Sequence, residues 1–224
     1  AQGNLRNRDA AIGLVSHEFK RRSVTVRRGL QPNCDPETLK RAKDALDRLK
    51  RINDACFHLM CGTAQRLEEG ELQRFLESDR DHVTWLLDCD GSEVELHVAS
   101  VGAVDIRVYA LSAEILRNAG QHICDSELKR EAERAQIEMR ISVAHCGIEI
   151  VCESRPHEFL IAHPERHFER PGNERMPLKG IALVWRLAEQ LGGTPRWNVI
   201  PDGNETIDGP DGATGRFRVV FEYK

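Results

Sequence analysis

The sequence predicts an α+β protein, in which a helical hairpin is followed by a domain of sheet and helices. Residues 4–63 repeat apolar side chains at heptad spacing, which is typical of long helices that pack on one another. Residues 94–223 instead contain several short runs of alternating apolar residues, which is typical of strands, separated by a few helix-like stretches. Because the pattern changes near residue 68, we predict two domains, at residues 1–68 and 80–224.

The first helix is predicted over residues 4–30, and its seam comprises Leu5, Ile12, Val15, Phe19, Val26 and Leu30. After a turn at residues 31–34, Asp35 and Pro36 are typical of the start of a second helix. That helix repeats the spacing at Leu39, Ala42, Leu46, Leu49, Asn53, Cys56, Met60 and Thr63. Two helices alone cannot bury both sides of such stripes. The pattern therefore predicts a homodimer through residues 4–67, associated as a four-helix bundle.

The second domain is predicted to mix strands and helices. Residues 68–80 are acidic and polar and are interpreted as a connector, followed by strands at 83–87 and 94–98 and a helix over 104–122. Alternation at 137–143 and 148–152 predicts two antiparallel strands joined at 145–147. After a predicted loop at 153–177, a helix over 179–191 ends at two glycines. Strands at 195–200 and 216–223 complete a sheet with helices on one side.

Composition narrows the classes of function. The 224 residues carry a formal net charge of −4, whereas a general nucleic-acid-binding surface needs a basic excess, so we expect no nucleic acid partner. No apolar run approaches the roughly 18 residues that a membrane span needs, so we expect no membrane contact within this chain. Seven dispersed cysteines without a CxxC pair favour a reducing compartment, and we expect a cytoplasmic location.

His17 is the first candidate for chemistry. On a helix it points roughly 200° away from the seam positions Val15 and Phe19, so it faces out of the predicted bundle. An imidazole is a competent nucleophile near neutral pH. The adjacent Glu18 could hold one ring nitrogen and leave the other free to attack. For a histidine considered alone, an ordinary surface position is the simpler interpretation.

Four segments, in this order, resemble the sequence boxes of bacterial sensor histidine kinases. Residues 16–19, Ser-His-Glu-Phe, resemble the H-box, which lies on the first helix of a hairpin. Residues 114–119, Glu-Ile-Leu-Arg-Asn-Ala, are similar to the N-box of the GHKL-type ATP-binding domain. Residues 168–170 resemble the F-box, and residues 179–193 resemble the G2-box with its following helix. The order of the four boxes, which cover nearly the whole chain, carries the resemblance.

The resemblance implies a dimerisation and histidine-phosphotransfer hairpin, followed by an α/β sandwich of the histidine kinase ATPase type. His17 would be the phosphoacceptor and Glu18 its hydrogen-bonding base. The partner would be a response regulator receiver domain, whose aspartate takes the phosphoryl group. The chain, which begins at Ala1 rather than Met, would also fit the cytoplasmic part of a larger sensor.

The resemblance further implies a site for ATP and Mg²⁺, in keeping with the needs of phosphoryl transfer. By motif position, Asn118 would be the magnesium ligand and Glu114 the carboxylate that is catalytic in other GHKL ATPases. His122 would lie near the nucleotide. Glu153 would stand where the family has an aspartate that reads adenine, and Gly180 would be the last glycine of the G2-box.

The nucleotide site departs from the family pattern where backbone should approach the phosphates. Residues that replace expected ones are Arg155 for a glycine, Met176 and Leu178 for two glycines, and Gln121 for a lysine. We therefore expect weak or absent nucleotide binding. Three interpretations stay open: an active, divergent histidine kinase; an ATP-independent histidine phosphotransferase; and a pseudokinase scaffold.

Overall fold

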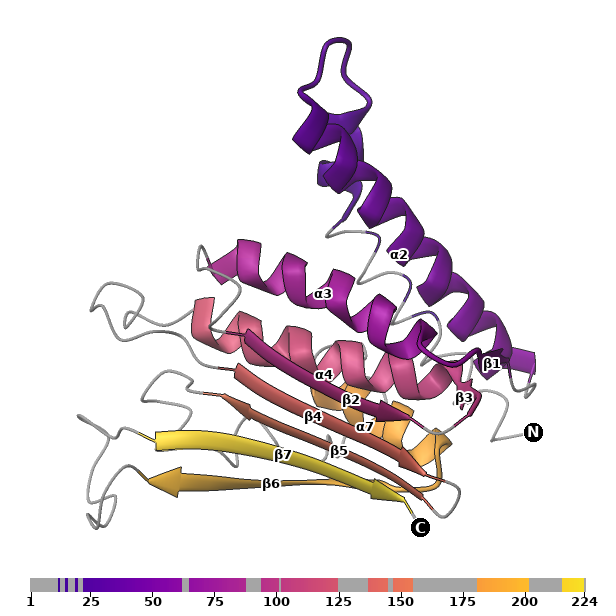
Figure 1. Ribbon diagram of the computed structural model, residues 1–224, viewed down its shortest axis with the longest axis vertical. Helices are drawn as coiled ribbons and strands as arrows, with labels where there is room; N and C mark the ends of the chain where they lie inside the picture. Colours follow the sequence, from indigo (N-terminus) through magenta and orange to yellow (C-terminus); the bar gives the residue numbers. More distant parts are fainter. Residues whose placement is uncertain are drawn as a thin grey trace. The chain divides into compact units, whose positions relative to one another are not determined.

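The computed structural model describes residues 12, 15, 19, 22–61, 65–87, 94–100, 102–124, 137–144, 147–154, 181–201 and 215–223 (Figure 1). They form two compact units that divide between Gln65 and Arg66. No helix among these residues has both the length and the hydropathy needed to cross a bilayer.

The first unit contains two helices that run antiparallel. Residues 22–29 are helical, as are Ile12, Val15 and Phe19, and the second helix, α2, spans Pro36–Cys61. Near one end the Cys56 thiol is hydrogen-bonded to the backbone of Val15. Near the other end Gly29 lies against Ala42. Because the partner number falls as the first helix advances, the two helices point in opposite directions.

The start of α2 has the predicted cap. Asp35 accepts a hydrogen bond from the backbone N–H of Thr38 at 2.9 Å and another from its hydroxyl at 2.6 Å. These hydrogen bonds favour the charged carboxylate and lower the pKa of Asp35. The turn before it contains Asn33 in the left-handed region, with φ of 65°. The turn at Asn33 thus ends the first helix, and the Asp35 cap begins α2.

The contact between the two helices uses only part of the predicted seam. The residues of α2 that are buried and apolar are Ala42, Ala45, Ile52, Ala55 and Cys56. Other apolar side chains of the hairpin stay exposed, and we call five of them the outer apolar residues: Ile12, Phe19, Leu39, Leu46 and Phe57. Leu46, for example, is 49% exposed. Each helix therefore has apolar surface that its neighbour within the chain does not cover.

The second unit is a five-stranded mixed sheet with helices packed on one face (Figure 1). The strand order is β2-β4-β5-β7-β6, where β2 is Val94–Ser100, β4 Ile137–Ala144, β5 Gly147–Ser154, β7 Gly215–Tyr223 and β6 Thr194–Pro201. Among the described strands, only β2 and β4 pair in parallel. A short ribbon of β1, Arg66–Leu67, and β3, Val104–Asp105, precedes helix α4. This arrangement confirms the α+β class and the strands predicted after residue 94.

The helix layer consists of α3, Glu71–Leu87, α4, Ile106–Cys124, and α7, Ile181–Gln190. The sheet turns one set of alternating side chains toward it. Met139 of β4 is paired with Cys152 of β5, which is paired with Val219 of β7, and all three are buried. After α7, Gly192 has φ of +82°, the helix stop that the sequence predicts. A Cβ on residue 193 would lie 2.4 Å from the Phe221 ring, so the backbone can pass this close to the ring only with glycine at this position.

Helix α3 replaces the connector and the strand predicted at 68–80 and 83–87, and that prediction was wrong. Leu72, Leu76 and Val83 recur at helical spacing and are buried. The Phe75 ring contacts the Tyr109 ring of α4 edge-on, with centroids 5.6 Å apart. Packing against α4 therefore overrides the local strand preference of the Val-Thr-Trp segment.

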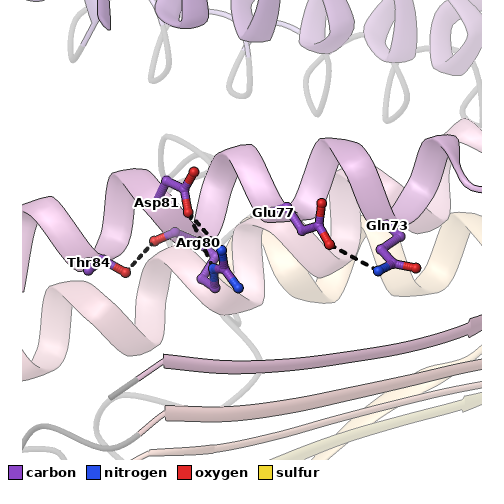
Figure 2. A network of polar contacts seen from close by, with 5 residues as sticks. All are labelled: Gln73, Glu77, Arg80, Asp81 and Thr84. Carbon is purple, nitrogen blue, oxygen red and sulfur yellow. Dashed lines mark hydrogen bonds and ion pairs between the residues drawn. The ribbon is translucent and has the colours of Figure 1, made fainter. Parts of the chain in front are cut away.

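The exposed side of α3 is polar, which explains why the sequence of residues 68–80 suggested a connector (Figure 2). Gln73 donates to Glu77 at 2.9 Å, and Arg80 is paired with Asp81 at 3.0 Å. The Thr84 hydroxyl donates to the Arg80 carbonyl at 2.9 Å. These polar residues form local contacts on a helix surface rather than a solvated linker.

Replacing Gly29 with alanine tests the helix contact in the first unit. A Cβ at residue 29 would lie 2.1 Å from the Cβ of Ala42, so the helices must separate. Overpacking costs about 1–3 kcal/mol, against about 1 kcal/mol gained from helix propensity. We expect Gly29→Ala to lower the free energy of unfolding, measured in urea. Gly29→Ala/Ala42→Gly should recover part of the loss, and a Gly29→Ala variant more stable than wild type would contradict this contact.

Candidate functional site

Helix α4 carries a polar stripe although it is buried along most of its length. With 100° per residue, Arg107, Asn118 and Gln121 lie within about 40° of Glu114 around the helix axis. The opposite side is apolar and includes the buried Leu116 and Ala119. The helix contacts α3, α7 and the sheet. Any charged group on α4 therefore needs a partner nearby.

Glu114 and Arg117 meet that need with a buried ion pair. Arg117 Nε donates to Glu114 Oε2 at 2.9 Å, and Arg117 Nη2 donates to Glu114 Oε1. The Glu114 side chain is 1% exposed and the Arg117 side chain 6%. Two parallel hydrogen bonds from a guanidinium to one carboxylate are among the strongest polar contacts in proteins. The carboxylate proposed for catalysis is thus engaged on both oxygens.

Asn118 belongs to the same cluster. Its Oδ1 accepts a longer hydrogen bond from Arg117 Nη2 at 3.4 Å. Its Nδ2 is buried and has no hydrogen-bond partner among the described residues. The structure therefore brings together two predicted site residues, Glu114 and Asn118, and places an unforeseen arginine between them. The i, i+3 spacing of Glu114 and Arg117 was the sequence signal for this pair.

A second arginine links this stripe to α7. Arg107 is paired with Asp105, with Nε 2.9 Å from Oδ1, and this contact raises the pKa of Arg107. Its Nη1 also donates to the carbonyl of Gln190, the last residue of α7, at 3.2 Å. Arg107 therefore ties the end of α7 to the first turn of α4, whereas Glu114 and Asn118 lie about two and three turns further along α4.

Glu153 lies away from the cluster on α4. On β5, Cys152 and Ser154 face the helix layer, so Glu153 between them faces the opposite side of the sheet. There its Oε1 lies 3.5 Å from Arg218 Nε and 3.8 Å from Arg140 Nη2. The structure does not bring Glu153 together with Glu114 and Asn118. The residue of this segment on the helix side is Ser154, which is buried, and the alternation of β5 could have indicated it.

Several predicted site residues fall outside the described part of the chain: His17, Glu18 and Gly180. The same holds for Arg155, Met176, Leu178 and residues 168–170 of the proposed F-box. His122 belongs to α4, but its side chain is not described. The roles assigned to these residues remain predictions from the sequence.

The cluster on α4 does not fit a magnesium ion. Mg²⁺ takes oxygen ligands in octahedral geometry, and both Glu114 oxygens and the Asn118 oxygen accept hydrogen bonds from Arg117. A second cation beside the guanidinium would meet repulsion inside a buried site. Within the described ranges, no group of three or more His, Cys, Asp or Glu side chains is placed to hold a metal ion.

The structure resembles several solved proteins at low sequence identity. A bacterial phosphotransferase is 12% identical, with 94% of this chain and 95% of that chain covered and a TM-score of 0.47. The histidine kinase domain of a blue-light activated histidine kinase from Erythrobacter litoralis is 15% identical, with 92% and 94% covered and a TM-score of 0.42. Full-length ShkA in complex with AMPPNP is 14% identical, with 93% and 44% covered and a TM-score of 0.42.

No family model matches the sequence, and no curated protein matches it. The likenesses are therefore likenesses of fold, and the chemistry has to be argued from this chain's own residues.

Two of the cysteines whose side chains the structure describes, Cys56 and Cys152, are buried and are poor nucleophiles. Burial raises the pKa of Cys56 to about 12, and burial together with the charge of Glu153 raises the pKa of Cys152 to about 12. Cys61 is exposed at the end of α2. Burial therefore argues against thiol chemistry at Cys56 and Cys152.

Alkylation tests this assignment. At pH 8 a thiol with a pKa near 12 is ionised in roughly one molecule in 10⁴, and burial blocks the reagent as well. We expect iodoacetamide to label Cys61 rapidly in the native protein and to leave Cys56 and Cys152 unlabelled, as followed by peptide mass spectrometry. In urea all three should react. Labelling of Cys56 or Cys152 at the native rate of Cys61 would be inconsistent with the packing described above.

Proposed function

We propose that this chain acts in two-component signalling, where His17 carries a phosphoryl group and exchanges it with an aspartate of a response regulator receiver domain. The antiparallel hairpin is the observation that carries the proposal. Val15 contacts Cys56 of α2, and a residue two positions further along a helix points about 200° away. This contact supports an outward His17 on a rigid helix, accessible to a docking protein.

The transfer needs no ATP when the donor is an aspartyl phosphate. The lone pair of one imidazole nitrogen attacks phosphorus, an N–P bond forms, and the P–O bond to the regulator's carboxylate breaks, so that the aspartate leaves as a carboxylate. The Glu18 carboxylate would accept a hydrogen bond from the other ring N–H and stabilise the positive charge that develops on the ring. The same step run in reverse phosphorylates a regulator.

The α4 cluster favours an ATP-independent histidine phosphotransferase over an active kinase. In an active kinase, Glu114 and Asn118 would be available to Mg²⁺ and ATP. Here Arg117 engages both of them, and Glu153 lies on the far face of the sheet. Retention of Glu114 and Asn118 is the observation that favours the kinase as the second candidate. A pseudokinase scaffold would differ from both in having no phosphorylated histidine.

Charge supports a partner of acidic character for the hairpin. Residues 1–65 contain 13 Lys and Arg against 7 Asp and Glu, whereas residues 66–224 contain 19 against 29. The hairpin is thus basic in a protein that is acidic overall. A basic surface attracts a partner whose phosphoacceptor is a carboxylate, mainly by speeding their encounter.

The outer apolar residues support the homodimer through residues 4–67. Leu39 and Leu46 share one heptad position on α2, and Phe57 lies close to the same line. Ile12 and Phe19 share one position on the first helix. Two hairpins that bury these residues against each other would complete a four-helix bundle. Such a bundle would hold the two copies of His17 on its outside.

The phosphoacceptor is tested with a phosphorylated receiver domain as donor. Wild type should take up label as acid-labile, base-stable phosphohistidine, and His17→Ala should take up none. His58→Ala is the matched control, because His58 is half-buried on α2 and should be dispensable. Mg²⁺–ATP supplied as the only donor should leave wild type unlabelled.

Each other outcome is informative. Equal labelling of wild type and His17→Ala would refute the assignment of the histidine. Labelling from Mg²⁺–ATP that depends on His17 would establish the active kinase instead. If the wild type binds the receiver domain but no donor labels it, the pseudokinase scaffold is the interpretation that remains.

The dimer is tested by placing a charge on the outer apolar line. Leu46→Asp should give a monomer, since Leu46 is exposed within one chain and a buried, unpaired carboxylate at an interface costs several kcal/mol. The helix content should be unchanged. Lys40→Asp, at an exposed position about 120° around α2, should remain dimeric. Light scattering at micromolar concentration measures both, and a monomeric wild type would rule out the four-helix bundle.

A further inference from the structure

We propose that Arg117 is an internal cation that stands where a magnesium ion would stand, so that the second unit is closed to metal–nucleotide by its own side chain. This inference deepens the proposed function, because it names the residue that makes phosphotransfer independent of ATP. It is independent of His17, which belongs to the other unit.

The geometry assigns the role of internal cation to Arg117, because its guanidinium is hydrogen-bonded to the oxygens that a metal ion would need as ligands. Its Nε and Nη2 face the two oxygens of Glu114, and Nη2 also reaches Asn118 Oδ1 at 3.4 Å. A carboxylate and an amide oxygen from neighbouring turns of one helix are ligands of the kind that Mg²⁺ prefers. The planar fork of arginine fits the same carboxylate with two hydrogen bonds. The Glu114 carboxylate can pair with a guanidinium or with a metal ion, and in this structure the guanidinium occupies it.

Burial makes the two cations mutually exclusive. The Glu114 and Arg117 side chains are 1% and 6% exposed. A buried carboxylate must be paired, and the partner that pairs with it is held strongly because either ion alone would be desolvated without compensation. Mg²⁺ could enter only if the guanidinium left, and the guanidinium would then need another anion. In the resting protein, Glu114 is neutralised without any ion from solution.

The Asn118 side chain is engaged at its oxygen only. Its Nδ2 is buried with no hydrogen-bond partner among the described residues. Buried amide donors are almost always satisfied, so this side chain is held by its oxygen alone. The guanidinium therefore takes the one Asn118 atom that could ligate a metal, and the amide donor is left without a described partner.

The experiment asks whether removing the guanidinium creates a metal site. Arg117→Met keeps the length and removes the charge. Thermal unfolding of the full chain is measured with and without millimolar Mg²⁺. We expect Mg²⁺ to raise the melting temperature of Arg117→Met by roughly 2–4 °C, the shift expected when the metal exceeds its dissociation constant about fivefold. Wild type should not shift.

Arg107→Met is the matched control. Arg107 is also an arginine of α4 paired with a carboxylate, Asp105, but it is half-buried and outside the Glu114 pair. Its loss should not produce a Mg²⁺ response. The double variant Glu114→Gln/Arg117→Met removes both charges. It should fold and show no Mg²⁺ response, because the ligand carboxylate is gone.

Three outcomes would overturn the proposal. Wild type could melt at a higher temperature in Mg²⁺, which would mean that metal and Arg117 coexist. A folded Arg117→Met could ignore Mg²⁺, which would mean that the cluster accepts only a guanidinium. Arg117→Met could stay unfolded at every Mg²⁺ concentration while the double variant folds, with the same meaning. None of these depends on phosphotransfer, so failure here and failure of His17 labelling are separate results.

Discussion

Burial of α4 along most of its length is the constraint on which the second unit depends. The helix lies in the middle of its layer, in contact with α3, α7 and the sheet. A polar side chain in that position must find its partner inside the protein, because water cannot supply one. Glu114 is paired with Arg117 one turn later, and Arg107 is hydrogen-bonded to Asp105 and to the last residue of α7. The same requirement that stabilises the layer therefore also decides which groups are left for a ligand.

The two units divide the physical tasks between them. The hairpin is basic, has apolar residues left over outside its helix contact, and would present its histidine on a rigid surface. The second unit is acidic and keeps its charged α4 cluster inside. A phosphoryl carrier needs an accessible nucleophile and a docking surface, and the proposed function assigns both to the hairpin.

The predictable part of the fold followed from periodicity. Alternation at Ile137, Met139 and Ile141 identified β4, since a period of two has a single structural meaning in a short run. Helix α3 was missed because its exposed side is rich in charged residues and its last turn reads Val-Thr-Trp, a strand-like segment. Its buried positions at Leu72, Leu76 and Val83 become decisive only when α4 is there to cover them.

The site divides in the same way. From sequence alone one could determine that Glu114 and Asn118 share a helix face, because four residues make about one turn. Whether that face was free depended on Arg117, whose side chain could equally have pointed into solvent; burial in the tertiary structure turned it onto the carboxylate. The face of the sheet on which Glu153 lies was likewise decided by pairing, because a shift of one residue in register moves a side chain to the other side. The sequence by itself determined the helical hairpin, the strands and the order of the motifs, which are local in origin. Only the tertiary structure decided which charges neutralise one another, because that depends on what the packing excludes from water.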